Sequence, residues 1–242
     1  MYKLLVSDFD GTLVGEELAI DYSTMLAIDK IRREKVLFAI ATGRCLGDIL
    51  YYNRDFSFLD YVVASNGAVV YDVNREKILF KKSISVVSVR KIYKAFKDYQ
   101  IYACRKDRKF ILVNLEDIKD IYKLEIICND LNDVEKVILI LDELGLNINY
   151  TKQYINGTYA ISIVSASINK FKGIEVVCDK IKINIDDVVA IGSSYNDIEM
   201  VKDVGVGVAM GDALEEVKSV AKEVTADNLH KGVEKFIEEK FR

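Results

Sequence analysis

Apolar and polar residues follow one another along this chain in two different patterns. The first is a short, uninterrupted apolar run that ends in small polar residues and is followed by apolar positions at helical spacing. Such runs are typical of buried parallel strands, each connected to the next by a helix. They predict strands at residues 3–7, 36–41, 61–65, 188–191 and 206–210, and helices at 22–33, from 46 onward, 170–180, 213–221 and 229–240.

The second pattern occupies residues 82–167. Several short segments alternate apolar and polar residues, as expected for strands with one solvated face, and two longer segments are amphipathic. We therefore expect an α/β protein whose doubly wound, mainly parallel, Rossmann-like core comprises residues 1–81 and 168–242, with residues 82–167 inserted as an α+β cap domain. The pattern predicts a hairpin at 68–71 and 78–80, helices at 86–97 and 134–144, and strands at 100–105, 110–115, 123–128, 146–150 and 159–164.

The first predicted strand delivers two carboxylates to one end of the sheet. Asp8 and Asp10 lie two residues apart at the strand end, so both point the same way while Phe9 turns into the packing. Open α/β sheets bind their ligands at this end of the strands. Two carboxylates held this close repel each other unless a cation lies between them or one is protonated. The segment therefore predicts a metal site, an acid/base pair, or both.

Other strand ends also present polar groups. The second strand ends at Thr42, Gly43 and Arg44, which are a hydroxyl, a glycine and a cation. The threonine is compatible with a helix cap, and the arginine either reaches a substrate or pairs with a surface acid. Asn66 closes the third strand as a substrate contact, a contact at the cap hinge or a plain turn residue.

Composition and charge narrow the range of partners. The chain has 242 residues, half of them hydrophobic, and a formal net charge of −4. Nucleic acids and anionic membranes are bound by net basic surfaces, so we expect neither as a partner. The longest uncharged run, residues 153–169, is too short and too polar to span a membrane, and the N-terminus lacks a signal-peptide pattern. We expect a cytoplasmic protein.

The cysteines are widely spaced and form no CxxC pair, and the chain has one histidine. This spacing suggests neither a zinc site nor a disulfide framework. We therefore expect reduced, mostly buried thiols at all four positions, which are Cys45, Cys104, Cys128 and Cys178.

The segment Asp8-Phe9-Asp10-Gly11-Thr12-Leu13, followed in order by the later strand ends, resembles the haloacid dehalogenase (HAD) superfamily of phosphatases. The similarity is to members with an α+β cap between the second and third family motifs, of the Cof type or the archaeal phosphoglycolate phosphatase type. It covers almost the whole chain. The family fold agrees with the one expected from the apolar pattern.

The resemblance implies a role for each matching residue. Asp8 would be the nucleophile that forms an aspartyl-phosphate, and Asp10 the general acid and base, a role that needs a raised pKa. Thr42 would bind a phosphoryl oxygen. Lys170, which before a helix is otherwise usually solvent-facing, would neutralise charge on the nucleophile and the phosphoryl group. The other candidate phosphate- or substrate-binding residues are Gly43, Arg44, Asn66 and Asn196.

The fourth family motif shows one departure. The family pattern is usually Gly-Asp-x-x-Asn-Asp, but this chain has Ser193 where an acidic Mg²⁺ ligand or ligand anchor is common. Mg²⁺ prefers a nearly octahedral shell of oxygen atoms and keeps several waters. The resemblance implies a Mg²⁺ cofactor held by Asp8, the Asp10 carbonyl and Asp197, with Ser193 contributing through its hydroxyl or a water. The lost charge should weaken metal binding.

We therefore expect a Mg²⁺-dependent phosphoric monoester hydrolase, a monomer or homodimer, that acts on a small phosphorylated metabolite. The compact cap looks most like that of archaeal-type phosphoglycolate phosphatases, with sugar-phosphate phosphatases next. One alternative is a catalytically attenuated phosphometabolite-binding or sensor protein. Another is a receiver-like regulator, against which the inserted cap and the DxDGT turn argue. The basic segment 90–109 is either a solvated face or a basic rim that attracts anionic metabolites.

Overall fold

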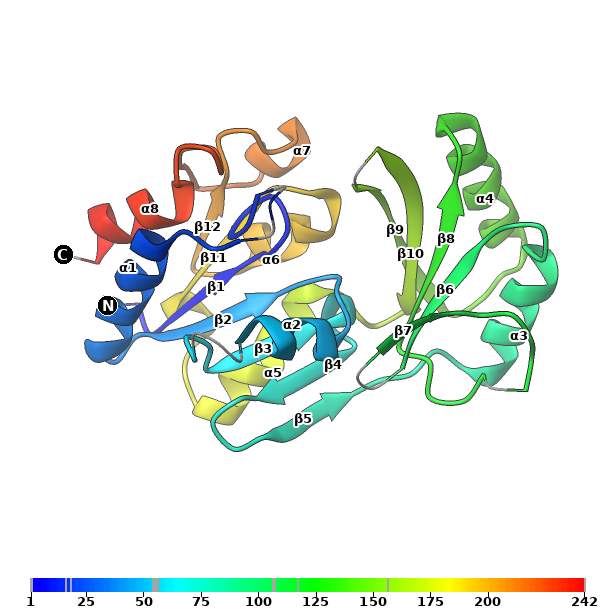
Figure 1. Ribbon diagram of the computed structural model, residues 1–242, viewed down its shortest axis with the longest axis horizontal. Coiled ribbons are helices and arrows are strands. Elements are labelled where there is room, and N and C mark those ends of the chain that lie inside the picture. Colours follow the sequence, from blue (N-terminus) through cyan, green and yellow to red (C-terminus); the bar gives the residue numbers. More distant parts are fainter. Residues whose placement is uncertain are drawn as a thin grey trace.

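The computed structural model describes residues 2–15, 17, 19–53, 57–105, 108–116, 118–155 and 157–241. Its strands form two sheets, one of eight strands and one of five, which lie next to each other along the long axis of the molecule (Figure 1). Each sheet has its own cluster of buried hydrophobic side chains. We call the larger one the core sheet and the smaller one the cap sheet.

The first strand lies inside the core sheet. β1 (Leu4–Ser7) pairs in parallel with β2 (Leu37–Ala41) on one side and with β11 (Val188–Gly192) on the other. The sheet order is β13-β12-β11-β1-β2-β3-β4-β5, so the chain builds one side of β1 first and later returns to build the other. The strand order reverses beside β1, and open α/β sheets bind ligands at the carboxyl end of the strands at such a point. The remaining strands are β3 (Tyr61–Ala64), β4 (Val69–Asp72, antiparallel to both neighbours), β5 (Lys77–Lys81), β12 (Val206–Ala209) and β13 (Glu223–Val224).

Helices connect the parallel strands of the core sheet. α1 packs against α8, and α5 packs against α6 and β3. A Cβ at Gly173 of α5 would lie 2.3 Å from a methyl carbon of Val63, so a glycine is needed for this close approach. None of the helices in the described ranges is long and apolar enough to cross a membrane. The helices are α1 (Tyr22–Arg33), α2 (Leu46–Asn53), α5 (Lys170–Ile181), α6 (Ile198–Asp203), α7 (Glu215–Lys218) and α8 (Gly232–Lys240), with 3₁₀ turns η1 (Ser65–Gly67), η2 (Ile185–Asp187) and η3 (Tyr195–Asp197).

The cap sheet is antiparallel, with the order β7-β6-β8-β10-β9. Along β8 (Lys123–Cys128), Leu124 and Ile126 belong to the hydrophobic cluster of the cap, and the alternation of a strand turns Lys123 and Glu125 to the opposite face. The two cap helices cover the hydrophobic face, on the side away from the core sheet (Figure 1). The polar face therefore looks toward the core. The other cap elements are α3 (Val86–Ala95), α4 (Leu131–Glu143), β6 (Ile101–Arg105), β7 (Arg108–Ile111), β9 (Ile148–Ile155) and β10 (Thr158–Ser165).

The expected fold class is confirmed: a mainly parallel α/β core carries an inserted antiparallel α+β unit. The chain passes between the two sheets after β5 and again after β10. Because each sheet has a hydrophobic cluster of its own, we propose that residues 82–167 form the cap domain and residues 1–81 with 168–242 the core domain.

The differences from the predicted elements lie in short or edge segments. The sequence pattern missed α6 and β13, which have six and two residues. The predicted helix at 213–221 is reduced to α7, and β9 extends to Ile155. The predicted strand at 110–115 is wrong in position, because β7 begins at Arg108 and ends at Ile111. β7 is an edge strand, where charged residues such as Arg108 and Lys109 are tolerated.

Candidate active site

The predicted site residues meet at the carboxyl ends of four neighbouring strands. Asp8 follows β1, Thr42 follows β2, Asn66 lies in η1 after β3, and Ser193 follows β11. Lys170 is the first residue of α5, whose N-cap residue Asn169 accepts a hydrogen bond from the backbone N–H of Lys172 (2.8 Å). The strands bring these residues together from positions far apart in the chain.

A buried lysine bridges two aspartates at the centre of the site. The Lys170 ammonium lies 2.6 Å from Asp8 Oδ1 and 2.6 Å from Asp197 Oδ1. All three side chains are buried, and Lys170 is 1% exposed. The other oxygen of Asp197, Oδ2, accepts hydrogen bonds from the backbone N–H groups of Ser193 and Ser194, each at 2.9 Å. Asp197 therefore joins the lysine to the loop after β11.

This arrangement leaves excess negative charge in a buried place. Burial and the charge of Asp197 together raise the pKa of Asp8 to about 7, although the Lys170 ammonium opposes both effects. One ammonium thus faces two carboxylates. Asp8 lies at the border between its protonated and ionised forms near neutral pH, and an additional cation beside it would favour the ionised form.

Asp10 is held by an arginine of the next strand end. The Arg44 guanidinium donates to both Asp10 oxygens, at 2.7 to 3.1 Å, and its plane lies over the rings of Phe9 and Tyr52. The sequence left open whether Arg44 reaches a substrate or pairs with a surface acid. In the structure Arg44 forms an ion pair, and its partner is the candidate site residue Asp10. Phe9 is fully buried beneath Arg44, as predicted.

Thr42 is fully buried, and its hydroxyl oxygen accepts a hydrogen bond from the backbone N–H of Arg44 (3.1 Å). This is the local turn contact of a capping residue. A hydroxyl that accepts one bond can still donate its own hydrogen. The observed contact is therefore compatible with phosphoryl binding as well as with capping.

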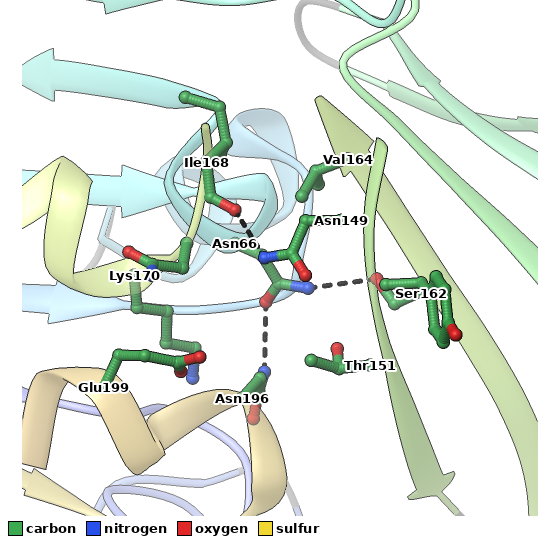
Figure 2. Close-up of a pocket in the computed structure, with 11 residues that line it drawn as sticks. Asn66, Asn149, Thr151, Ser162, Val164, Ile168, Lys170, Asn196 and Glu199 are labelled. Atoms are coloured by element: carbon green, nitrogen blue, oxygen red, sulfur yellow. Dashed lines mark hydrogen bonds between the residues drawn. The ribbon is translucent and has the colours of Figure 1, made fainter. Parts of the chain in front are cut away.

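Asn66 connects the core to the cap. Its amide donates to Ser162 Oγ of β10 (3.0 Å), and its carbonyl oxygen accepts from the Asn196 amide (3.0 Å), as Figure 2 shows. Asn66 adopts a left-handed conformation with φ of 54°, which asparagine tolerates better than most residues. Asn66 and Asn196 are thus brought together beneath the cap, beside Lys170 (Figure 2).

The residues near Asp8 can be tested as Mg²⁺ ligands. The second oxygen of Asp8, Oδ2, lies 3.5 Å from Thr12 Oγ1, which lies 3.2 Å from Ser193 Oγ. Carboxylate and hydroxyl oxygens are donors that suit Mg²⁺, which needs one or two carboxylates when waters and a substrate phosphate complete its shell. The residues fit the ion as a site of low charge. Among the described residues, no three His, Cys, Asp or Glu side chains gather as a metal site.

The expectation of four reduced cysteines is wrong. Cys45, directly after Arg44, forms a disulfide with Cys104 of β6, with 5.9 Å between their Cα atoms. Cys128 and Cys178 are free and buried, as predicted. Pairing of cysteines 59 positions apart depends on how the cap sits on the core, and the sequence pattern does not report this. Three polar residues at the site were also missed: Thr12, Lys123 and Ser162.

Of the basic segment 90–109, α3 carries exposed basic residues on the side of the cap away from the core (Figure 1). Lys109 of β7 instead pairs with Glu125 on the polar face of the cap sheet. The solvated-face alternative therefore describes α3, and Lys106 and Asp107 lie outside the described residues.

The candidate site thus pairs a strand-end aspartate with a buried lysine, under an antiparallel unit inserted into an α/β core. The family model described as haloacid dehalogenase-like hydrolase matches residues 5–116 and 105–237. These matches span most of the chain, which belongs to the haloacid dehalogenase-like hydrolase family. This confirms the resemblance found in the sequence.

Sequence relatives agree. The phosphoglycolate phosphatase of Methanosarcina acetivorans is 31% identical over 98% of this chain and 96% of its own length. That of Methanopyrus kandleri is 27% identical over the same shares. A Bacillus subtilis 5-amino-6-(5-phospho-D-ribitylamino)uracil phosphatase is 28% identical over 97% and 94%. The structure of a haloacid dehalogenase-like hydrolase from B. subtilis has a TM-score of 0.88 at 18% identity and covers 98% of this chain and 99% of that one. The chain is a phosphatase, a hydrolase of phosphoric monoesters.

Proposed function

We propose that this phosphatase hydrolyses a small phosphorylated metabolite, phosphoglycolate or a sugar phosphate, through an aspartyl-phosphate on Asp8, with Mg²⁺ as cofactor and in the cytoplasm. The observation that supports it most directly is the buried Lys170 ammonium, 2.6 Å from both Asp8 and Asp197. An ammonium in this place neutralises charge that develops on a phosphoryl group transferred to Asp8.

In this mechanism Asp8 attacks the phosphorus atom and the leaving oxygen departs toward the cap. Thr42 donates its O–H to a phosphoryl oxygen, and Lys170 pairs with the growing negative charge. Asp10, released by Arg44, protonates the leaving oxygen and later removes a proton from the water that hydrolyses the aspartyl-phosphate. Asp197 holds Lys170 and the loop of Ser193 in place.

Mg²⁺, when bound, neutralises charge between the nucleophile and the phosphoryl oxygens. The Asp8 carboxylate, the Asp10 carbonyl and the Ser193 hydroxyl would hold it. Both oxygens of Asp197 already have hydrogen-bond partners. We therefore propose that Asp197 positions Lys170 and the loop of Ser193, and we do not assign it as a metal ligand.

The substrate class rests on the three sequence relatives named above, two phosphoglycolate phosphatases and one 5-amino-6-(5-phospho-D-ribitylamino)uracil phosphatase. Among members of one fold, the parts outside the shared core select the leaving group. The relatives therefore nominate two classes of substrate, and the cap should decide between them.

The test is phosphate release from a panel of small esters that contains phosphoglycolate and sugar phosphates. We expect turnover with Mg²⁺ that chelation removes and that Asp8→Asn reduces by about 10³-fold or more, because the variant lacks the nucleophile. The control is Asp98→Asn, which makes the same change at an exposed position of the cap and keeps the nucleophile. Release from none of the esters by the unmodified protein, indistinguishable from Asp8→Asn, would overturn the proposal.

Two observations favour a second candidate, a phosphometabolite sensor with attenuated catalysis. Ser193 replaces an acidic residue, and Arg44 occupies both oxygens of Asp10. For such a protein, phosphate or a phosphate mimic would raise the melting temperature in the presence of Mg²⁺ while no ester is hydrolysed. Hydrolysis of an ester by the unmodified protein, together with loss of this activity in Asp8→Asn, would exclude the sensor function.

A further inference from the structure

The polar face of the cap sheet places a lysine directly at the candidate active site. Lys123 of β8 is 2% exposed, and its ammonium donates to the backbone carbonyl of Gly43. Gly43 lies between Thr42 and Arg44. A Cβ at Gly43 would lie 3.2 Å from Asn66 Oδ1, so its backbone is in close contact with the site asparagines.

Glu125 holds this lysine in place. It lies two residues further along β8, on the same face as Lys123, and it pairs both with Lys123 and with Lys109 of the edge strand β7, two strands away in the sheet. Burial alone would raise the pKa of Glu125, but the two ammonium groups lower it to about 2, so the carboxylate stays ionised. Two ammonium groups share one carboxylate, and the trio keeps one positive charge.

Apart from Lys123, the cap side chains described beside Gly43 and Asn66 are neutral, and the Lys152 ammonium of β9 lies instead over the Tyr195 ring, 4.3 Å from its centroid. Ser162 of β10 lies beside Glu125 in the sheet register and hydrogen-bonds Asn66, and the Gln153 amide lies near Gly43. Hydroxyl and amide groups can bind sugar hydroxyls, but they offer no charge to an anion. Lys123 is thus the described cap residue that brings positive charge to the Gly43 backbone.

We propose that Lys123, positioned by Glu125, is a specificity-determining residue that binds an anionic group, a carboxylate or a second phosphate, on the leaving-group side of the substrate. The inference rests on the proposed function, which has the leaving oxygen face the cap. Before substrate binds, Lys123 uses the neutral Gly43 carbonyl. An anionic oxygen is the stronger acceptor for an ammonium and would replace it. Between the two substrate classes, this favours phosphorylated hydroxy acids.

The test compares kcat/KM for phosphoglycolate, a bisphosphate of similar size, and glycerol 1-phosphate, whose leaving group is neutral. Lys123→Gln should lower kcat/KM for the anionic leaving group by about 10- to 100-fold and change that for glycerol 1-phosphate by less than about threefold. Lys123→Arg should retain part of the preference. The control is Lys94→Gln, which makes the same change on the exposed outer face of α3. Whether phosphoglycolate or the bisphosphate loses more identifies the anion.

Equal losses of kcat/KM on all three esters would mean that Lys123 only ties the cap to the core. No loss on any ester would mean that Lys123 does not select the substrate. Either result overturns the inference.

A second measurement separates failure of this inference from failure of the proposed function. In Asp8→Asn protein, which cannot turn over, phosphoglycolate should raise the melting temperature more than glycerol 1-phosphate does, and adding Lys123→Gln should remove the difference. If the unmodified protein hydrolyses nothing but this difference is seen, the binding inference stands and the catalytic proposal falls. If phosphoglycolate and glycerol 1-phosphate raise the melting temperature of Asp8→Asn protein equally, the binding inference falls too.

Discussion

At the scale of single residues, the site is a balance of charges. Three carboxylates, Asp8, Asp10 and Asp197, face two cations, Lys170 and Arg44. A fourth carboxylate at position 193 would increase the repulsion around Asp8, whose pKa is already raised to about 7 by burial and by Asp197. Compared with an aspartate, Ser193 therefore reduces the repulsion between carboxylates when no cation is bound. It also contributes less negative charge to a bound cation.

The first prediction concerns Ser193→Asp. The added carboxylate should lower the Mg²⁺ concentration needed for half-maximal activity by about tenfold or more, since it adds a charged ligand beside Asp8. In chelator, the same variant should melt at a lower temperature than the unmodified protein because the buried repulsion is unopposed. Titrations of activity and of melting temperature with Mg²⁺ measure both effects. The control Ser219→Asp adds the same charge at an exposed helix end and should change neither the Mg²⁺ requirement nor the melting temperature in chelator. An unchanged Mg²⁺ requirement in Ser193→Asp would show that position 193 is not near the ion.

The sequence predicted much of this balance. Strand ends at Asp8, Thr42 and Asn66 follow from apolar runs, and the contact of Lys170 with Asp8 was expected from the family motifs. The ion pair of Arg44 with Asp10 was left open, because two side chains 34 positions apart find each other through the packing of neighbouring strands. Thr12 escaped notice since a threonine in a turn carries no signal of its partner Ser193.

At the scale of elements, the loop after β2 and the turn η1 both contact the cap. Cys45 forms a disulfide with Cys104 of β6, the Gly43 carbonyl accepts from Lys123 of β8, and Asn66 of η1 donates to Ser162 of β10. The cavity beside Lys170, between β9, β10 and the core, has a volume of about 10 Å³, room for about one water. We expect a phosphorylated metabolite to enter when the cap lifts from the core, a movement that the disulfide between Cys45 and Cys104 would oppose.

The second prediction follows from that disulfide. Reduction by a dithiol adds two electrons and two protons to the bond, releases two thiols, and frees the cap from the loop. Activity of the oxidised protein should be about a tenth or less of that of the reduced protein, and Cys104→Ser should be active in both conditions. Cys128→Ser, which removes a free buried thiol of the cap, should retain the redox response. Thiol counting confirms each state; equal rates in the oxidised and reduced protein would show that cap movement is not limited by this bond.

Elements were predictable where apolar periodicity is long and internal. α1 and β8 begin and end where the pattern placed them, whereas α6, β13 and β7 were missed or misplaced. Short elements contain too few residues to show a period, and an edge strand such as β7 pairs on one side only. Their positions are fixed by contacts with neighbouring elements.

At the scale of the whole molecule, the proposed core and cap domains are joined by two crossings of the chain. The core could be predicted as a parallel sheet because each strand and helix repeats one pattern. The residues that the cap turns toward the core could not be assigned. Strand alternation separates Lys123 and Glu125 from Leu124 and Ile126, but the placement of the cap decides which face meets the site. The molecule is acidic overall, and the cap brings Lys123 to the candidate site.

The proposed mechanism requires Asp8 to take the phosphoryl group from the substrate. The most direct test is the mass of the intact protein after mixing with phosphoglycolate and Mg²⁺ and rapid acid quenching, followed by mapping of the modified peptide. We predict the addition of one phosphoryl group at Asp8, absent in Asp8→Asn and lost on longer incubation as water hydrolyses the acyl phosphate. Turnover without any phosphorylated protein, or a phosphoryl group on a residue other than Asp8, would contradict the account.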